Sequence, residues 1–149
     1  MLRQLLVGGF VSVINIAIHS LMMATVVGLA QRAGAKKRLH PSLFLAFVMI
    51  PIVSVLMATH TVEVMVWASA YALVDAAPEN VQLVYFAFVN YATLGYGDIV
   101  PVDRWKLLGP ITAMNGVLLF GWSTAVIFEV LRKTMELSGP AGVKRSSRR

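Results

Sequence analysis

The sequence predicts an all-α membrane protein with three membrane-spanning helices and one shorter helix that enters the bilayer without crossing it. Composition is the first reason, because 58% of the 149 residues are hydrophobic and only 13% are charged. Soluble domains carry roughly a quarter charged residues. The second reason is that the apolar residues gather in three runs long enough to cross a hydrocarbon core about 30 Å thick.

The three expected spans lie at about Leu5–Leu29, Ile52–Val74 and Leu107–Leu131. Each provides at least the roughly 20 helical residues that a crossing needs. Pro51 lies inside an apolar run that begins near Ser42, and we expect it to begin or kink the second helix because proline has no amide hydrogen to donate. The sequence leaves open whether Ser42–Ile50 belongs to the spanning helix.

A fourth apolar run, Val81–Ala92, would make only about 18 Å of helix, too little to cross. A half-length helix followed by irregular backbone is tolerated at membrane depth only where it is buried in protein or lines a watery cavity. We expect this re-entrant helix over residues 80–92, with Asn80 as its N-cap. Its macrodipole would place about half a negative charge near Ala92, which favours a cation there.

The residues that follow this helix have a backbone suited to binding a dehydrated potassium ion. Thr93-Leu94-Gly95-Tyr96-Gly97-Asp98 contains two glycines, one residue apart. K⁺ needs about eight oxygens to replace its water, and successive carbonyls turn inward only where some residues adopt conformations that a β-carbon disfavours. Residues 93–98 are therefore predicted to form a selectivity filter.

Residues from about 52 to 131 resemble the pore domain of the potassium channel superfamily, in particular small prokaryotic ion channels with one pore loop per chain. Pro101 and Trp105 follow the filter aspartate at the spacing familiar from bacterial two-helix channels. The resemblance implies K⁺ binding by carbonyls of the filter, with a threonine hydroxyl closing the innermost site. The implied ion-binding residues are Thr93, Leu94, Gly95 and Tyr96, followed by the filter glycine Gly97.

The residues that would support the filter depart from the family pattern. Tyr85 and Phe86 stand where well-known members carry two adjacent tryptophans, and Phe86 has no hydrogen-bond donor. Val89 stands where some relatives carry a glutamate that pairs with the filter aspartate, here Asp98. We expect Tyr85, Phe86 and Asp98 to support the filter through an altered set of contacts.

Four residues of the third span are candidates for gating. Gly116 and Gly121 lie near the position of the gating glycine in such channels. Asn115 either faces the cavity or packs against a neighbouring helix. Glu129 can pair with the basic residues that follow it, at the expected inner mouth of the pore.

One chain supplies one filter strand, whereas a ring of carbonyls around an ion needs four. The sequence has no second filter motif, so four identical chains around a closed axis are expected. A subunit that assembles only with other channel chains is an open alternative.

Basic residues predict the orientation. Four of the 13 lie in the loop after the first span and six follow the third, so both regions are expected on the cytoplasmic face, beside anionic lipids. The N-terminus and the filter would then face outward. Because these charges flank helices and form no domain, nucleic acid is not expected as a partner.

These expectations divide the chain into four parts. The first two are a transmembrane helix at residues 1–31 and a basic cytoplasmic loop at 32–41. A pore domain at 42–133 follows, with its inner helix at 107–132, and a basic cytoplasmic tail occupies 134–149.

Polar side chains interrupt the first two spans at similar depths. Asn15 and His19 lie one turn apart, and His60 and Glu63 are at i, i+3, so the pairs Asn15–Glu63 and His19–His60 should meet on antiparallel helices. Ionisable groups there are costly unless they satisfy one another. A hydrogen-bonded clamp is the favoured interpretation, with a proton-sensing gate and a metal site as alternatives.

The predicted function is passive, K⁺-selective conduction through a homotetramer in the cell (inner) membrane. No cofactor beyond the permeant ion and no covalent catalysis are expected. A non-conducting regulatory membrane subunit and a weakly selective cation channel are the alternatives.

Overall fold

The structure is a computed structural model that describes residues 1–33, 40–79 and 81–138. The predicted all-α architecture is confirmed over these residues, and three of the helices are long and apolar enough to cross a membrane. The basic residues between positions 34 and 39, Asn80 and the tail from residue 139 lie outside the described residues.

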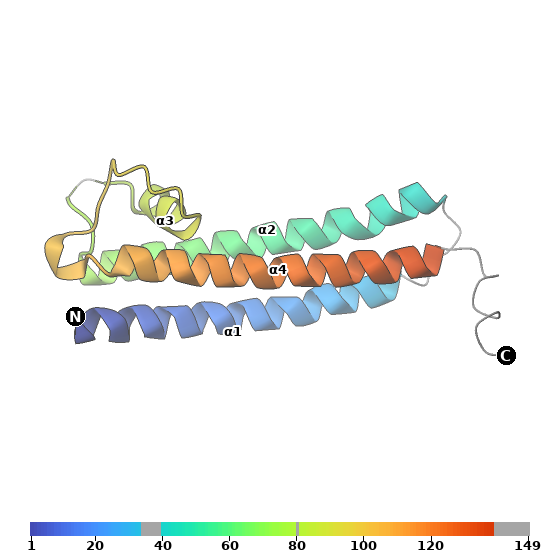
Figure 1. Cartoon of the computed structure of the whole chain (residues 1–149), viewed down its shortest axis with the longest axis horizontal. Helices are drawn as coiled ribbons and strands as arrows, with labels where there is room; N and C mark the ends of the chain where they lie inside the picture. Colours follow the sequence, from blue (N-terminus) through green and yellow to red (C-terminus); the bar gives the residue numbers. More distant parts are fainter. Residues whose placement is uncertain (34–39, 80, 139–149) are drawn as a thin grey trace.

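Three long helices lie side by side along the molecule (Figure 1). They are α1 (Leu2–Ala33), α2 (Pro41–Val74) and α4 (Leu108–Ser138), and each contacts the other two. The short helix α3 (Leu83–Tyr91) packs on α2 and α4 at one end of this bundle. A single 3₁₀ turn, Asp103–Trp105, lies between the expected filter segment and α4.

The N-terminus lies at the same end of the bundle as α3 (Figure 1). The Leu107 amide donates a hydrogen bond to Gln4 Oε1 at 2.8 Å, and the Arg3 guanidinium lies 5.1 Å from the centre of the Trp105 ring. These contacts hold the start of α1 beside the segment that leads into α4. The N-terminus and the 93–98 segment therefore share one side of the molecule.

Polar and apolar residues are distributed as they are in a protein whose solvent is lipid. Leu6 is 64% exposed and Phe128 is 65% exposed, whereas the side chains of Asn15, His19 and Glu63 are fully buried. Hydrocarbon offers no hydrogen bonds, so polar groups turn inward while large apolar side chains can face outward.

The second span is longer than the sequence pattern indicated. The sequence placed the span at about Ile52–Val74 and left open whether residues 42–50 belong to it. α2 begins at Pro41 and continues through Pro51, so these residues are part of the helix and Pro51 does not begin it. One missing amide removes a single helical hydrogen bond, which an apolar helix packed against two neighbours tolerates. Proline occupies the first turn at Pro41 instead, where no amide donor is required.

Two further boundaries differ from the expected ones. The re-entrant helix α3 begins at Leu83, with Gln82 rather than Asn80 as its N-cap residue. α4 continues to Ser138, so the first residues assigned to the tail are helical. Ion pairs three and four residues apart extend α4 past its apolar stretch, including Arg132 with Glu136 at 2.9 Å.

Gly116 allows α4 to approach the end of α3 at backbone distance. A β-carbon at Gly116 would lie 2.1 Å from the carbonyl oxygen of Tyr91, whereas one at Gly121 would meet nothing within 4 Å. Of the two glycines considered for gating, Gly116 therefore has a packing requirement within the chain and Gly121 has none.

Replacing Gly116 by alanine should destabilise the protein, because the methyl group would press on backbone that cannot rotate away. We expect a loss of about 1–3 kcal/mol, the usual cost of overpacking. Thermal unfolding of the purified protein in detergent measures it. Gly121→Ala, on the same helix, is the matched control and should unfold near the wild-type temperature; equal losses in the two variants would contradict this account.

Candidate functional site

The end of α3 is a hydrogen-bonded turn that leads directly into the 93–98 segment. The Thr93 amide donates to the Asn90 carbonyl at 3.0 Å, and the Leu94 amide donates to the Val89 carbonyl at 2.9 Å. These two bonds form a Schellman motif, which places the first residue beyond the helix in the left-handed region and usually selects glycine. Here that residue is Thr93, with φ 59°.

A left-handed threonine is disfavoured by about 1–2 kcal/mol because its β-carbon crowds the following carbonyl. The helix could end in the same motif with glycine at no such cost. A strained residue in a candidate site suggests that its side chain has a role there. The Thr93 hydroxyl at the base of the filter segment is the group that glycine lacks.

The left-handed conformation recurs at every second residue of the segment. Gly95 has φ 59° and Gly97 has φ 78°, whereas Leu94 and Tyr96 between them do not share the positive φ. Alternating handedness turns successive peptide planes the same way, so neighbouring carbonyls face one side instead of opposite sides as in a β-strand. β-carbons at the two glycines would meet nothing within 4 Å. Glycine is therefore required at these positions by the backbone angle and not by crowding.

The 93–98 segment lies on the surface of the single chain and is anchored at its C-terminal end. Tyr96 is 67% exposed. The Tyr85 hydroxyl, on α3, donates a hydrogen bond to Asp98 Oδ2 at 2.7 Å. This bond raises the pKa of Tyr85 above its usual value, because the carboxylate holds the phenol proton. Tyr85 and Asp98 thus support the segment together.

Phe86, the other expected supporting residue, contributes packing. It is buried, and its ring centre lies 5.0 Å from that of Tyr71 on α2. The Tyr71 hydroxyl is 2.6 Å from Thr112 Oγ1 on α4 and accepts a bond from Asn90 Nδ2 at 3.4 Å. The polar contacts beside Phe86 therefore join α2, α3 and α4, whereas the bond from Tyr85 to Asp98 joins α3 to the 93–98 segment.

Asn115 is buried and does not face a cavity within the chain. Its Oδ1 accepts hydrogen bonds from Asn15 Nδ2 at 3.2 Å and from Trp67 Nε1 at 3.0 Å. The structure supports the interpretation that Asn115 packs against neighbouring helices, here α1 and α2.

Glu129 lies in the C-terminal part of α4. Its Oε1 is 2.9 Å from the Arg132 guanidinium and 3.1 Å from Lys133 Nζ. The expected pairs are present. Because all three side chains are exposed, these ion pairs add little stability.

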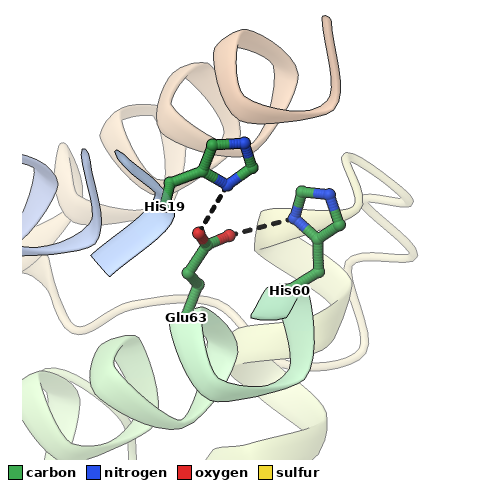
Figure 2. A group of neighbouring side chains, drawn as sticks. All are labelled: His19, His60 and Glu63. Atoms are coloured by element: carbon green, nitrogen blue, oxygen red, sulfur yellow. Dashed lines mark hydrogen bonds and ion pairs between the residues drawn. The ribbon is translucent and has the colours of Figure 1, made fainter. Parts of the chain in front are cut away.

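The buried polar cluster is centred on Glu63, which lies between two histidines (Figure 2). His19 Nδ1 is 2.8 Å from Glu63 Oε1, and His60 Nδ1 is 2.9 Å from Oε2. Asn15 contacts the same residue through its backbone, because its Nδ2 donates to the Glu63 carbonyl at 3.2 Å. The structure thus brings together all four residues that the spacing placed at similar depths.

Two further members of the cluster were not found from the sequence. The Tyr91 hydroxyl donates a short hydrogen bond to Glu63 Oε2. Ser123 Oγ lies 3.0 Å from His60 Nε2 and 3.4 Å from His19 Nε2. A buried carboxylate needs several hydrogen-bond donors, so the sequence could have indicated only that further partners were required. It could not identify Tyr91 and Ser123, because these residues come from helices whose rotation the sequence leaves free.

The cluster could also hold a metal ion in principle, since ligand atoms of His19, His60 and Glu63 lie within 4.8 Å of one another. Each carboxylate oxygen, however, is already at hydrogen-bond distance from one imidazole Nδ1. The geometry therefore fits the hydrogen-bonded clamp better than a metal centre.

The family model described as "Ion channel" matches residues 59–133, about half of the chain. The match covers part of α2, all of α3, the filter segment and most of α4. No curated protein and no solved structure matches the chain.

Replacing Glu63 by alanine should destabilise the protein strongly, because two imidazoles and one phenol lose their shared acceptor. A buried donor left without its acceptor costs about 1–3 kcal/mol. Thermal unfolding in detergent measures the loss, and Glu136→Ala, which removes an exposed carboxylate from α4, is the control with little expected effect.

The contact between Glu63 and His60 can be isolated by a double-mutant cycle. The variant with both His60→Ala and Glu63→Ala should lose less stability than the two single variants added together. Additive losses would show that the two side chains do not interact.

Proposed function

The chain belongs to the ion channel family, and we propose that it is a potassium-selective channel whose pore is formed by four identical copies. The alternating backbone of residues 93–97 is the observation that carries the proposal. Carbonyls that face one side can replace the water around K⁺, and fixed carbonyls at successive levels provide several sites along one axis. The carbonyls of Thr93, Leu94, Gly95 and Tyr96 bind the ion.

The geometry of one chain supports the assembly of four. A single filter strand lies on the surface of its chain and offers carbonyls from one direction only. A closed ring of four strands surrounds the ion and covers this exposed segment. α3 ends where the filter begins, so four helix dipoles direct partial negative charge toward the axis.

Ions move passively, down their gradient, and the protein provides only the path. The chain lies in the cell membrane with its N-terminus and filter outside and its C-terminus in the cytoplasm. The shared side of the N-terminus and filter segment is consistent with this orientation. The basic loop and tail then lie beside anionic lipids of the inner leaflet.

Gly95→Ala should abolish K⁺ flux and leave membrane insertion intact. The added β-carbon disfavours φ near 59° and breaks the alternation that faces the carbonyls inward. K⁺ and Na⁺ fluxes into liposomes containing the purified chain measure the effect. Gly9→Ala is the matched control, because a β-carbon there meets nothing and the residue is helical.

Wild-type K⁺ selectivity in Gly95→Ala would contradict the filter assignment. Equal K⁺ and Na⁺ flux in the wild type would instead identify a weakly selective cation channel. An assembled wild type that passes neither ion would favour a regulatory subunit.

Single cysteines test the orientation cleanly, because the natural chain has none. A cysteine at Leu2 should react with an impermeant thiol reagent added outside intact cells, whereas one at Ala35 should react only after the cells are opened. Basic segments stay on the cytoplasmic side, and the loop after the first span is far richer in basic residues than the printed residues before it. The reverse labelling pattern would overturn the proposed topology.

A further inference from the structure

Four side chains of the buried cluster close into a ring of hydrogen bonds. Glu63 contacts both histidines through their Nδ1 atoms, and the two Nε2 atoms converge on one hydroxyl, Ser123 Oγ. The four distances around the ring are 2.8, 2.9, 3.0 and 3.4 Å. The ring joins α1, α2 and α4, and Tyr91 adds α3 from the side.

The number of hydrogens in this ring is fixed by donor and acceptor chemistry. An ionised carboxylate only accepts. The Tyr91 hydroxyl, which also lies 3.0 Å from His60 Nδ1, gives its one hydrogen to Glu63, so both Nδ1 atoms must carry hydrogen. If both imidazoles are neutral, both Nε2 atoms are then acceptors, and Ser123 has a single hydrogen to donate. One Nε2 would face an oxygen lone pair in a buried site, which costs the desolvation of an unpaired polar group.

One additional proton completes every bond in the ring. With Nε2 of one histidine protonated, Ser123 accepts from that imidazole and donates to the other. With a second additional proton, both Nε2–H groups would point at the Ser123 oxygen, and the hydrogen of Ser123 would have no acceptor. The ring is therefore complete with one excess proton, and rotation of the Ser123 hydroxyl lets the proton reside on either histidine.

Charge leads to the same number. The titratable groups that face one another here are His19 from α1, His60 and Glu63 from α2, and Tyr91 from α3, while α4 contributes the uncharged Ser123 and the Trp122 ring against His19. One imidazolium balances the Glu63 carboxylate. Without it, a single negative charge would be left in a low-dielectric interior, which is costly.

We propose that this ring is a proton-binding site that holds one excess proton shared between His19 and His60, and that loss of the proton is transmitted to the filter through Tyr91. The proton-binding site stands apart from conduction, whereas its effect on ion flux rests on the proposed function.

Tyr91 is positioned to transmit the change. Its hydroxyl is bonded to Glu63, its carbonyl lies against Gly116, and it is the last residue of α3, two residues before Thr93. When the ring loses its proton, one Nε2 atom loses its bond to Ser123, so the ring holds Glu63, and through it Tyr91 at the end of α3, less firmly. K⁺ flux should therefore fall as the pH rises, because the loaded ring is the form present at lower pH.

Glu63→Gln is the variant that tests the proton count, because it keeps the size of the side chain. An amide both donates and accepts, so the ring closes with the same number of bonds and no excess proton. One histidine donates to the amide oxygen, the other accepts from the amide nitrogen, and Ser123 bridges the two Nε2 atoms as before. The variant should fold with both ring histidines neutral.

Nitrogen NMR of histidine-labelled full-length protein in lipid nanodiscs reports the protonation of each imidazole. The chain has three histidines, and the exposed His40 serves as an internal reference. The spectra are recorded at about pH 8, above the ordinary histidine pKa of about 6.5. The ring of the wild type should still hold one imidazolium proton per chain, Glu63→Gln should hold none, and the control Glu136→Gln should match the wild type.

Two neutral ring histidines in the wild type at that pH, or an imidazolium retained in Glu63→Gln, would overturn the proton-binding site. K⁺ flux into liposomes between about pH 6 and 9 tests transmission. Wild-type flux should fall with rising pH, Glu63→Gln should show no such fall, and Tyr91→Phe should keep the ring proton while losing the pH dependence.

The two proposals fail in different ways. A ring that holds its proton in a channel whose flux ignores pH would overturn transmission through Tyr91 and leave the proton site in place. A chain that shows the ring proton and passes no K⁺ at any pH would overturn the proposed function, together with the effect on flux.

Discussion

The buried carboxylate of Glu63 is the group on which the arrangement of the helices most depends. Hydrocarbon supplies no water to a charged side chain, so every acceptor position must be met from within the protein. The donors come from α1 and α3 as well as from α2 itself, through His19, Tyr91 and His60. Apolar side chains facing lipid specify little about which helix lies beside which, whereas these bonds form in only one arrangement. The cluster therefore fixes the relative rotation of helices that hydrophobicity alone leaves free.

The same contacts help to fix the position of the 93–98 segment. Tyr91 is fixed through its hydroxyl by Glu63, and its backbone lies against Gly116, so the last turn of α3 is held from two sides. The Schellman turn that follows sets the left-handed conformation of Thr93, from which the alternation to Gly97 continues. Selection by the proposed filter requires carbonyls that keep their places, and the residues just before it belong to a helix end that is bonded to the membrane bundle.

The first helix is part of this arrangement, although the family match begins at residue 59 and does not include it. Asn15 reaches both the Glu63 carbonyl and Asn115, and His19 completes the ring of hydrogen bonds with Ser123. The pore-domain helices alone would leave Glu63 Oε1 without its imidazole donor. α1 therefore supplies polar groups that the rest of the chain requires, in addition to apolar surface.

Local properties of the chain determined much of this protein from sequence alone. The three spans follow from hydropathy, and the short length of α3 follows from its short apolar run. The positive φ at positions 95 and 97 follows from glycine, which adopts a backbone angle that other residues avoid. The similar depth of Asn15, His19, His60 and Glu63 follows from a constant rise per residue. Tertiary structure decided what depends on how helices are rotated and how closely they approach. Tyr91 and Ser123 joined the cluster, Asn115 turned inward to Trp67, and Gly116 became a point of backbone contact. The continuation of α2 through Pro51 belongs to the same group, because neighbouring helices compensate for one lost bond. A sequence fixes the distance of a side chain along its helix, but its direction around the axis has meaning only once the partner helices are in place.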